Sequence, residues 1–245
     1  IDPKAPAKHR YKTQAKVYPT GQFHVHSSPD GLRWKLFAKL NPGRGGWDTQ
    51  SVAFWDLNIE RYALYTRYWM SHRHGTAKAP DNFRTVRRLE SDDLKSWHKQ
   101  GIVMQPDEAD RALHPTLPGQ PPVDYYGADV FRYAEADRAY IMLAQAYWHW
   151  QPRAPREGLG PAGFDVRLAV SRDGVKFKRW NEAFLRPGIG RPGSWQYGQQ
   201  YIAWNVVETL SSLPGAPNEL SLYATEDYWH GKGGTLRRYT LRLDG

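Results

Sequence analysis

Residues Ser28 to Trp34 read SPDGLRW, and the same pattern returns twice along the chain. Residues 91–97 read SDDLKSW and residues 171–177 read SRDGVKF, while a shorter echo, TED, stands at 225–227. A Ser and an Asp two residues apart can satisfy backbone donors in a turn, and a following Gly tolerates a positive φ angle. The closing Trp or Phe is expected to begin a strand and to pack between neighbouring sheets. The motif therefore predicts a repeated turn between two strands.

The sequence before each of the later motifs reads as a series of strands joined by polar turns. Residues 48–69 read DTQSVAFWDLNIERYALYTRYW, and residues 125–148 read YYGADVFRYAEADRAYIMLAQAYW. Apolar and polar residues alternate with a period of two in RYALYTRYW (61–69) and in DVRLAVS (165–171), as half-buried strands require. We expect the segment around TED to follow the same scheme. The pattern predicts a repeated antiparallel unit of three to four strands, the size of a propeller blade, with Gly- and Pro-rich insertions that make the spacing uneven.

Composition supports an all-β protein and excludes some kinds of site. The 245 residues include eleven Trp and fifteen Tyr against three Met, which favours strands and stacking surfaces over helical bundles. The chain has no Cys, so a disulfide framework and a thiolate metal site are both excluded.

The charge of the chain points to an anionic partner. The formal net charge is +9, and a basic protein attracts polyanions such as an acidic polysaccharide. We do not expect a nucleic acid, because the densest basic cluster, residues 84–88 (RTVRR), has no nucleic-acid-binding motif around it. No apolar run has the length of a membrane span, so no membrane partner is expected. The opening IDPKAPAKHRYK has no initial Met and reads as part of a longer polypeptide.

The repeated motif resembles a known group of enzymes. The sialidase Asp box is one residue longer than SPDGLRW and SRDGVKF, whose shorter form resembles the five-bladed β-propeller glycosidases of the arabinanase, xylosidase and invertase type. The closing YTLRLDG (239–245) is similar to the last propeller strand of invertase-like members. The resemblance implies an all-β, five-bladed β-propeller, of which about four blade-like units are recognisable. We expect residues 1–245 to form one propeller domain, incomplete at the N-terminus and followed by further sequence.

The resemblance also implies hydrolysis of a glycosidic bond in a polysaccharide or oligosaccharide, an anionic one in view of the charge. This reaction needs two carboxyl groups, one protonated and one ionised, on either side of the glycosidic oxygen. Glycosidases of this fold place carboxylates at the axial tips of their inner strands. Asp48 is the first candidate because it opens an apolar strand, and Asp124 is the second. Glu157, in a long predicted loop, is the stand-in for the general acid.

Substrate-binding residues are expected near the same strand tips. Trp residues beside a tip can stack on the apolar face of a sugar ring, and Arg can neutralise an acidic sugar. The residues predicted to bind substrate are Trp47, Arg67, His72, His74, Tyr125, Trp148, Gln200 and Tyr201.

Two other functions stay open at this stage. A polysaccharide lyase would use His, Tyr and Arg to remove a proton beside a uronate carboxylate, with Arg67 and Tyr125 as its natural members. A non-catalytic propeller would only bind carbohydrate. No cofactor and no protein-bound metal are predicted, although the resemblance leaves room for Ca²⁺ in the axial channel. An extracellular or periplasmic location is expected.

Overall fold

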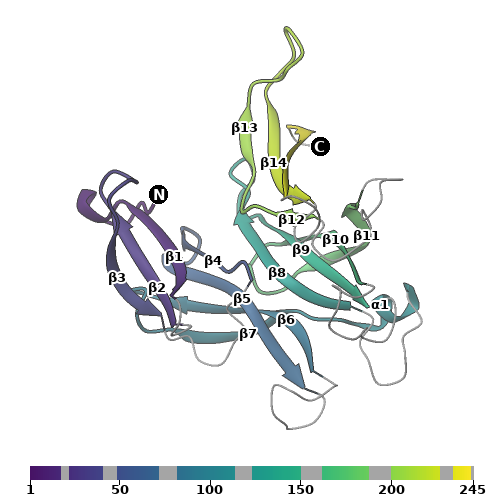
Figure 1. Ribbon diagram of the computed structural model, residues 1–245, viewed down its shortest axis with the longest axis horizontal. Coiled ribbons are helices and arrows are strands. Elements are labelled where there is room, and N and C mark those ends of the chain that lie inside the picture. Colours follow the sequence, from purple (N-terminus) through teal and green to yellow (C-terminus); the bar gives the residue numbers. More distant parts are fainter. Residues whose placement is uncertain are drawn as a thin grey trace.

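The computed structural model describes residues 1–17, 22–40, 49–71, 82–113, 123–149, 162–187, 200–226 and 234–243. They form four antiparallel sheets that are arranged as the blades of a β-propeller (Figure 1). The prediction of an all-β propeller with about four recognisable blades is therefore confirmed.

The blades follow one another in chain order. Blade 1 follows the short 3₁₀ helix η1 (Ala7–His9) and contains β1 (Tyr11–Val17), β2 (Gln22–Ser28) and β3 (Lys35–Leu40). Blade 2 contains β4 (Val52–Asp56), β5 (Arg61–Ser71), β6 (Asn82–Ser91) and β7 (His98–Met104). Helix α1 (Glu108–Leu113) leads to blade 3, which contains β8 (Val123–Arg132), β9 (Tyr140–His149), β10 (Ala162–Ser171) and β11 (Lys178–Leu185). Blade 4 contains β12 (Tyr201–Ile202), β13 (Val207–Thr209), β14 (Glu219–Glu226) and β15 (Thr235–Arg242).

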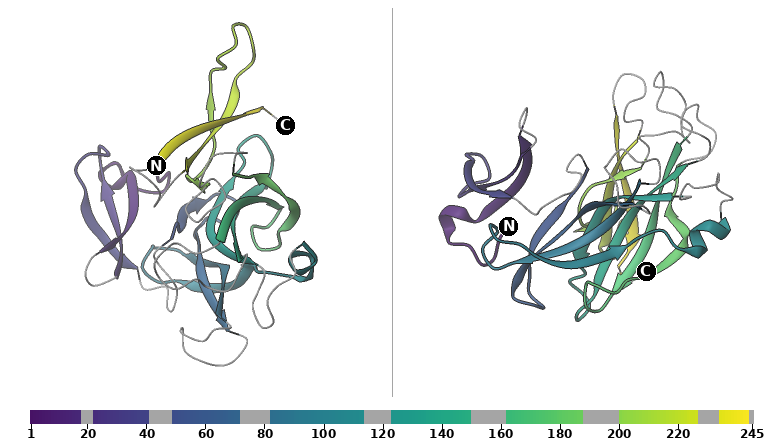
Figure 2. Two further views of the ribbon diagram at one scale, coloured as in Figure 1. Left: turned by 45° about the vertical axis from the view of Figure 1, so that its right-hand side comes forward. Right: turned by 90° about the horizontal axis from the view of Figure 1, so that it is seen from below.

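The fourth blade is built differently from the second and third. Its inner edge is divided into two short strands, β12 and β13, which both pair with β14, and β14 pairs in turn with β15. Asn205, with a φ angle of 75°, lies between the two short strands. The hairpin that joins β13 to β14 projects away from the other blades (Figure 1, Figure 2).

The repeated motif forms the same turn in each of the first three blades. Each Ser hydroxyl accepts two backbone N–H groups, and one carboxylate oxygen of each Asp accepts two more, all at 2.7–3.2 Å. In blades 2 and 3 these turns join the third strand to the fourth, and the turn of blade 1 joins β2 to β3. Asp30, Asp93 and Asp173 therefore occupy equivalent turns, as the repeat predicts.

The expectation for TED was wrong. Strand β14 pairs with the inner strands β12 and β13, so it is the second strand of its blade, and Glu226 ends that second strand. The motif turns follow a third strand instead. The short echo also lacks the closing aromatic residue of the motif.

Three apolar clusters hold neighbouring blades together. One cluster joins blades 1 and 2, the largest joins blades 2 and 3, and one joins blades 3 and 4. Trp97 and Phe177, the closing aromatics of the second and third motifs, pack against the first two of these clusters, as expected. Trp34 closes the first motif and is 40% exposed, because the described residues place no earlier blade beside it. No helix in the described part of the chain has the length and apolar character needed to cross a bilayer.

Candidate functional site at the inner-strand tips

Several functional side chains gather at one end of the blades, which we call the mouth. In an antiparallel blade the start of the first strand, the end of the second and the start of the third lie at the same end. The mouth is therefore formed by the end of β5, the start of β6, the start of β8, the end of β9, the start of β10 and β12. The motif turns lie at the opposite end. Thr49 joins two inner strands at the mouth, because its hydroxyl donates to the carbonyl of Tyr126 at 3.1 Å.

A buried carboxylate at the mouth is held by an arginine of the neighbouring blade. Asp124, the second residue of β8, is only 1% exposed and forms an ion pair with the guanidinium of Arg84 in β6. The backbone N–H of Arg84 also donates to Asp124 at 3.1 Å. A neighbouring cation and hydrogen-bond donors both favour the charged form of a carboxyl group. Asp124 is therefore suited to act as an ionised group and not as a proton donor.

A β-bulge brings Tyr126 to the mouth. The pairing of β8 with β9 shifts register between Tyr125 and Gly127, which leaves Tyr126 as the extra residue. Gly127 is required beside it, because a Cβ atom at this position would lie 2.7 Å from the side-chain Cδ of Gln145. The bulge therefore separates the two adjacent tyrosines: Tyr125 faces the core between blades 2 and 3, and Tyr126 joins the residues of the mouth.

Two arginines lie over the aromatic rings of the mouth. The guanidinium of Arg84 lies 4.3 Å from the ring centre of Trp69 and 4.8 Å from that of Tyr126. The guanidinium of Arg67 lies 5.3 Å and 5.0 Å from the same two rings. Arg67 is 2% exposed, and its burial together with the charge of Arg84 lowers its pKa from the usual value. The two cations are thus close enough to repel each other, and the contacts of both with the rings of Trp69 and Tyr126 stabilise them.

Further aromatic rings extend this cluster toward blade 4. The ring of Phe164 stacks on Tyr147 at 4.9 Å and lies 5.1 Å from the ring of Tyr201. Tyr126 contacts Phe164, Tyr147 and Tyr201 at 5.4–6.3 Å between ring centres. Trp69, Tyr147 and Tyr201 are half-buried, so each keeps part of its ring accessible. Accessible rings beside cations can stack on a sugar and bind its charged substituents.

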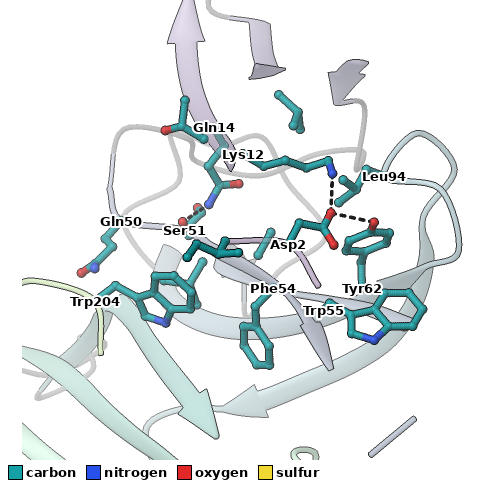
Figure 3. Close-up of a pocket in the computed structure, with 15 residues that line it drawn as sticks. Asp2, Lys12, Gln14, Gln50, Ser51, Phe54, Trp55, Tyr62, Leu94 and Trp204 are labelled. Carbon is teal, nitrogen blue, oxygen red and sulfur yellow. Dashed lines mark hydrogen bonds and ion pairs between the residues drawn. The ribbon is translucent and has the colours of Figure 1, made fainter. Parts of the chain in front are cut away.

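A separate pocket lies between blade 1 and the inner strand of blade 2 (Figure 3). It has a volume of about 200 Å³, with Lys12 and Gln14 of β1 on one side and residues Ser51–Trp55 on the other. Trp204 of blade 4 also lines it and stacks on Phe54 at 6.1 Å. The side-chain amide of Gln14 donates to the carbonyl of Ser51 across the pocket.

The residues predicted from sequence fall into three groups. Asp124, Arg67 and Tyr201 lie in the group of aromatic rings, arginines and carboxylate at the mouth, which we call the mouth cluster. Tyr125, Trp148 and Gln200 are buried. The Tyr125 hydroxyl donates to the carboxylate of Asp110 at 3.1 Å, and the ring centre of Trp148 lies 4.7 Å from the guanidinium of Arg167. The side-chain amide of Gln200 donates to the carboxylate of Glu226 at 3.3 Å. The remaining candidates lie outside the described residues and stay predictions; they are Trp47, Asp48, His72, His74 and Glu157.

Sequence reasoning did not single out four residues of the cluster as site residues, namely Trp69, Arg84, Tyr126 and Tyr147. Arg84 was counted only as part of a basic run. The neighbouring Tyr125 was favoured over Tyr126 because alignment of the blades by sequence places Tyr125 level with Asp48. The dipeptide Tyr126-Gly127 was the available signal, since an isolated Gly in a strand often marks a bulge.

A metal site finds no support among the described residues, where no group of three His, Asp or Glu side chains lies close enough together to hold an ion. No step of the chemistry below depends on a metal.

Comparison with solved structures supports the fold. A structure titled as a glycoside hydrolase matches 91% of this chain and 57% of its own, with a TM-score of 0.53 and 12% sequence identity. An α-L-arabinanase of Penicillium chrysogenum in complex with arabinobiose matches 94% of this chain and 70% of its own, with a TM-score of 0.51 and 9% identity. The chain thus spans little more than half the length of the first of these structures. The sequence itself matches neither a protein-family model nor a curated protein.

Proposed function

We propose that this chain is the propeller of a glycosidase that binds and cleaves a polysaccharide or oligosaccharide at the mouth. The observation that carries the proposal is the cluster of half-buried aromatic rings, two arginines and one Arg-paired carboxylate at the tips of strands from three blades. The likeness in fold to glycoside hydrolases supports the proposal. Glycoside hydrolysis requires carboxyl groups beside the bound sugar, and a carboxylate lies beside these rings.

Three carboxyl groups have roles in this proposal. Asp48 opens the segment that leads into β4 and is the base or nucleophile. Asp124 is a second ionised carboxylate, which the pairing with Arg84 suits to stabilising the positive charge that develops on the sugar ring. Glu157 is the proposed general acid, because the ion pair with Arg84 favours the ionised form of Asp124.

The proposed substrate carries acidic groups. Arg67 and Arg84 both lie in the mouth cluster, and the whole chain has a formal charge of +9. Guanidinium groups bind carboxylates through two parallel hydrogen bonds, which gives both charge recognition and orientation. A uronate-containing glycan would use Arg84, which is partly accessible, for a carboxylate and the rings of Trp69, Tyr147 and Tyr201 for its apolar sugar faces, while the buried Arg67 adds positive charge behind them.

The test is hydrolysis of a panel of neutral and acidic polysaccharides by the parent protein, followed by kcat measurements on Asp48→Asn and Asp124→Asn. Both substitutions keep the shape of the side chain and remove its charge. Loss of a catalytic carboxylate is expected to lower kcat by roughly 10²- to 10⁴-fold, with a smaller change in KM.

The matched control is Asp56→Asn. Asp56 is also fully buried and paired with an arginine, Arg88, at 3.3 Å, but it ends β4 at the face opposite the mouth. This variant is expected to lose stability and to keep its kcat per folded molecule. Full activity in both Asp48→Asn and Asp124→Asn would contradict the assigned roles, and failure of the parent to cleave any glycan of the panel would contradict the hydrolase proposal itself.

One observation favours a lyase as the second candidate. The guanidinium of Arg67 lies 5.0 Å from the ring centre of Tyr126, so a tyrosine and an arginine of the kind that β-elimination uses lie side by side. In that reaction the ionised Tyr oxygen takes the proton from C5 and a double bond forms between C4 and C5. The C4–O bond breaks with its electron pair on the leaving oxygen, which takes up a proton. An unsaturated, ultraviolet-absorbing product would establish the lyase, whereas a saturated reducing end without it would establish hydrolysis.

A further inference from the structure

Blade 3 contains another pocket, which lies at the face opposite the mouth. The pocket has a volume of about 570 Å³ and is bounded by the turn that joins β8 to β9 and by the motif turn that follows β10. Both turns lie entirely within the described residues. Tyr133, Ile141 and Val170 contribute apolar surface to the pocket wall. The pocket is thus separate from the mouth, and the hydrolysis proposed above does not use it.

Positive charge gathers at this pocket. Its lining residues include three exposed cations, Arg172, Lys176 and Lys178. Within the described part of the chain neither lysine forms a salt bridge, and Arg172 donates to a neutral acceptor, the backbone carbonyl of Asp137, at 2.7 Å. The carboxylate of Asp173 also lines the pocket, but it accepts two backbone N–H groups of the motif turn at 2.7 and 2.8 Å. Three positive charges against one negative charge favour an anionic ligand.

The motif turn does not need these cations for its own structure. Blade 2 forms the same turn, with the same backbone hydrogen bonds to its Ser and Asp side chains. The positions equivalent to the three cations are occupied there by Asp92, Ser96 and His98. The charges of blade 3 are therefore additional to the turn. Like charges close together repel each other, so a ligand of opposite charge would stabilise them.

An exposed aromatic ring continues this surface along β11. Trp180 is 40% exposed and lies two residues after Lys178, on the same face of the strand. The ammonium group of Lys178 lies 5.5 Å from the centre of the Trp180 ring. An exposed Trp ring can stack on the apolar face of a sugar, and a cation beside it can bind a carboxylate on that sugar. The pocket, the lysine and the ring follow one another in a row, which suits an oligosaccharide better than a single ion.

We propose that the pocket and Trp180 form a binding site for an acidic glycan, separate from the mouth. One uronate unit occupies the pocket, with its carboxylate bound by Lys176 and Lys178 and its apolar face against the pocket wall. The neighbouring unit of the glycan stacks on Trp180. The choice of a glycan as ligand rests on the proposed function, whereas the site itself rests on the pocket, the unpaired lysines and the exposed ring.

An NMR titration with a galacturonate trisaccharide measures binding at this site. The indole N–H signal of Trp180, assigned with the variant Trp180→Phe, should shift saturably in the parent protein. In the double variant Lys176→Gln/Lys178→Gln the affinity reported by this signal should fall by about 10-fold or more, because two charge-assisted contacts are lost.

The matched control is the double variant Arg33→Gln/Lys35→Gln. It removes the same charge from the equivalent positions of blade 1, where Arg33 is already paired with Asp30 at 2.9 Å. The affinity at Trp180 should change little in this variant. Equal losses in the two double variants would assign the attraction to the net charge of the molecule and would overturn the site.

Three other results would also overturn the proposal: no shift of the Trp180 signal in the parent, equal affinity for a neutral trisaccharide, or equal affinity for sulfate alone. Failure of this site and failure of the proposed function can be distinguished. A parent protein that binds the trisaccharide at Trp180 but cleaves no glycan retains the site and loses the hydrolase. Cleavage without any shift at Trp180 retains the hydrolase and loses the site.

Discussion

At the scale of single residues, the motif glycine of blade 3 has a second role besides its backbone angle. Gly174 has a φ angle of 70°, and its carbonyl accepts the hydroxyl of Tyr65 at 2.7 Å across the boundary with blade 2. A Cβ atom here would lie 2.6 Å from that hydroxyl and would also overlap the guanidinium of Arg88, which Asp56 and Glu90 hold in place. In the second motif Leu94 takes the equivalent position at a φ angle of 65°, and its side chain fills the cluster between blades 1 and 2. The same turn position is therefore used to dock blade 2 on blade 1 and blade 3 on blade 2.

The substitution Gly174→Ala tests this docking contact. It is expected to lower the free energy of unfolding by about 2–4 kcal/mol, because overpacking is added to the strain of a positive φ angle. Gly215→Ala is the matched control, since Gly215 has a φ angle of 73° but open space around it. The free energy of unfolding of Gly215→Ala should be lower than that of the parent by about 1 kcal/mol, from backbone strain alone. Denaturant titration of both variants measures the difference, and equal losses would show that Gly174 needs only its backbone angle.

At the scale of the element, the motif turns are held by charged groups. Hydrogen bonds from backbone N–H groups contribute to holding the pKa of Asp93 and of Asp173 below the usual value, although partial burial acts in the opposite direction. A carboxyl group whose pKa is lower in the folded state stabilises the fold above its unfolded pKa, near 4, and this contribution is lost as the pH falls through the folded pKa. The turns are therefore expected to weaken in acid.

The variants Asp93→Asn and Asp173→Asn test the contribution of these turns. Each substitution is expected to lower the free energy of unfolding by about 1 kcal/mol near pH 7, by analogy with the loss of a capping side chain. The loss should be smaller below pH 4, because the carboxyl groups of the parent protein are themselves becoming protonated there. Melting temperatures measured from pH 3 to 7 should therefore converge with those of the parent at the acid end. Asp92→Asn, an exposed neighbour paired with Arg61, is the control and should change stability little. A constant difference across this pH range would show that charge is not what the turns need.

At the scale of the whole molecule, the positive charge is expected to attract an acidic glycan. The formal charge of +9 and the arginines of the mouth act together at low ionic strength, and exposed charges are screened beyond about 8 Å at physiological salt. We expect the affinity for a uronate oligosaccharide to fall several-fold between low and high salt, and the affinity for a neutral oligosaccharide of the same length to stay constant. Calorimetric titration of the two ligands measures both. The same salt dependence for both glycans, or none for either, would contradict an anionic substrate.

The regular features of the propeller were predictable from sequence because they depend on local chemistry. A Ser and an Asp two residues apart satisfy the N–H groups of their own turn, so SPDGLRW and its relatives indicate the same turn wherever they occur. Alternating apolar residues and aromatic enrichment indicate half-buried strands, and repetition of the unit indicates blades. These patterns were sufficient for the all-β class, the repeat and the three equivalent turns at Asp30, Asp93 and Asp173.

The composition of the mouth depended on the tertiary structure. One extra residue in β8 exchanges the roles of Tyr125 and Tyr126, and no regular period can report such a bulge. Arg84 and Asp124 are forty residues apart in the chain and meet only because two blades pack together. TED resembles the motif but ends a second strand, since strand order within a blade is decided by pairing and not by local sequence. Turns and strands follow from neighbouring residues, whereas a site between blades follows from contacts that only the complete packing creates.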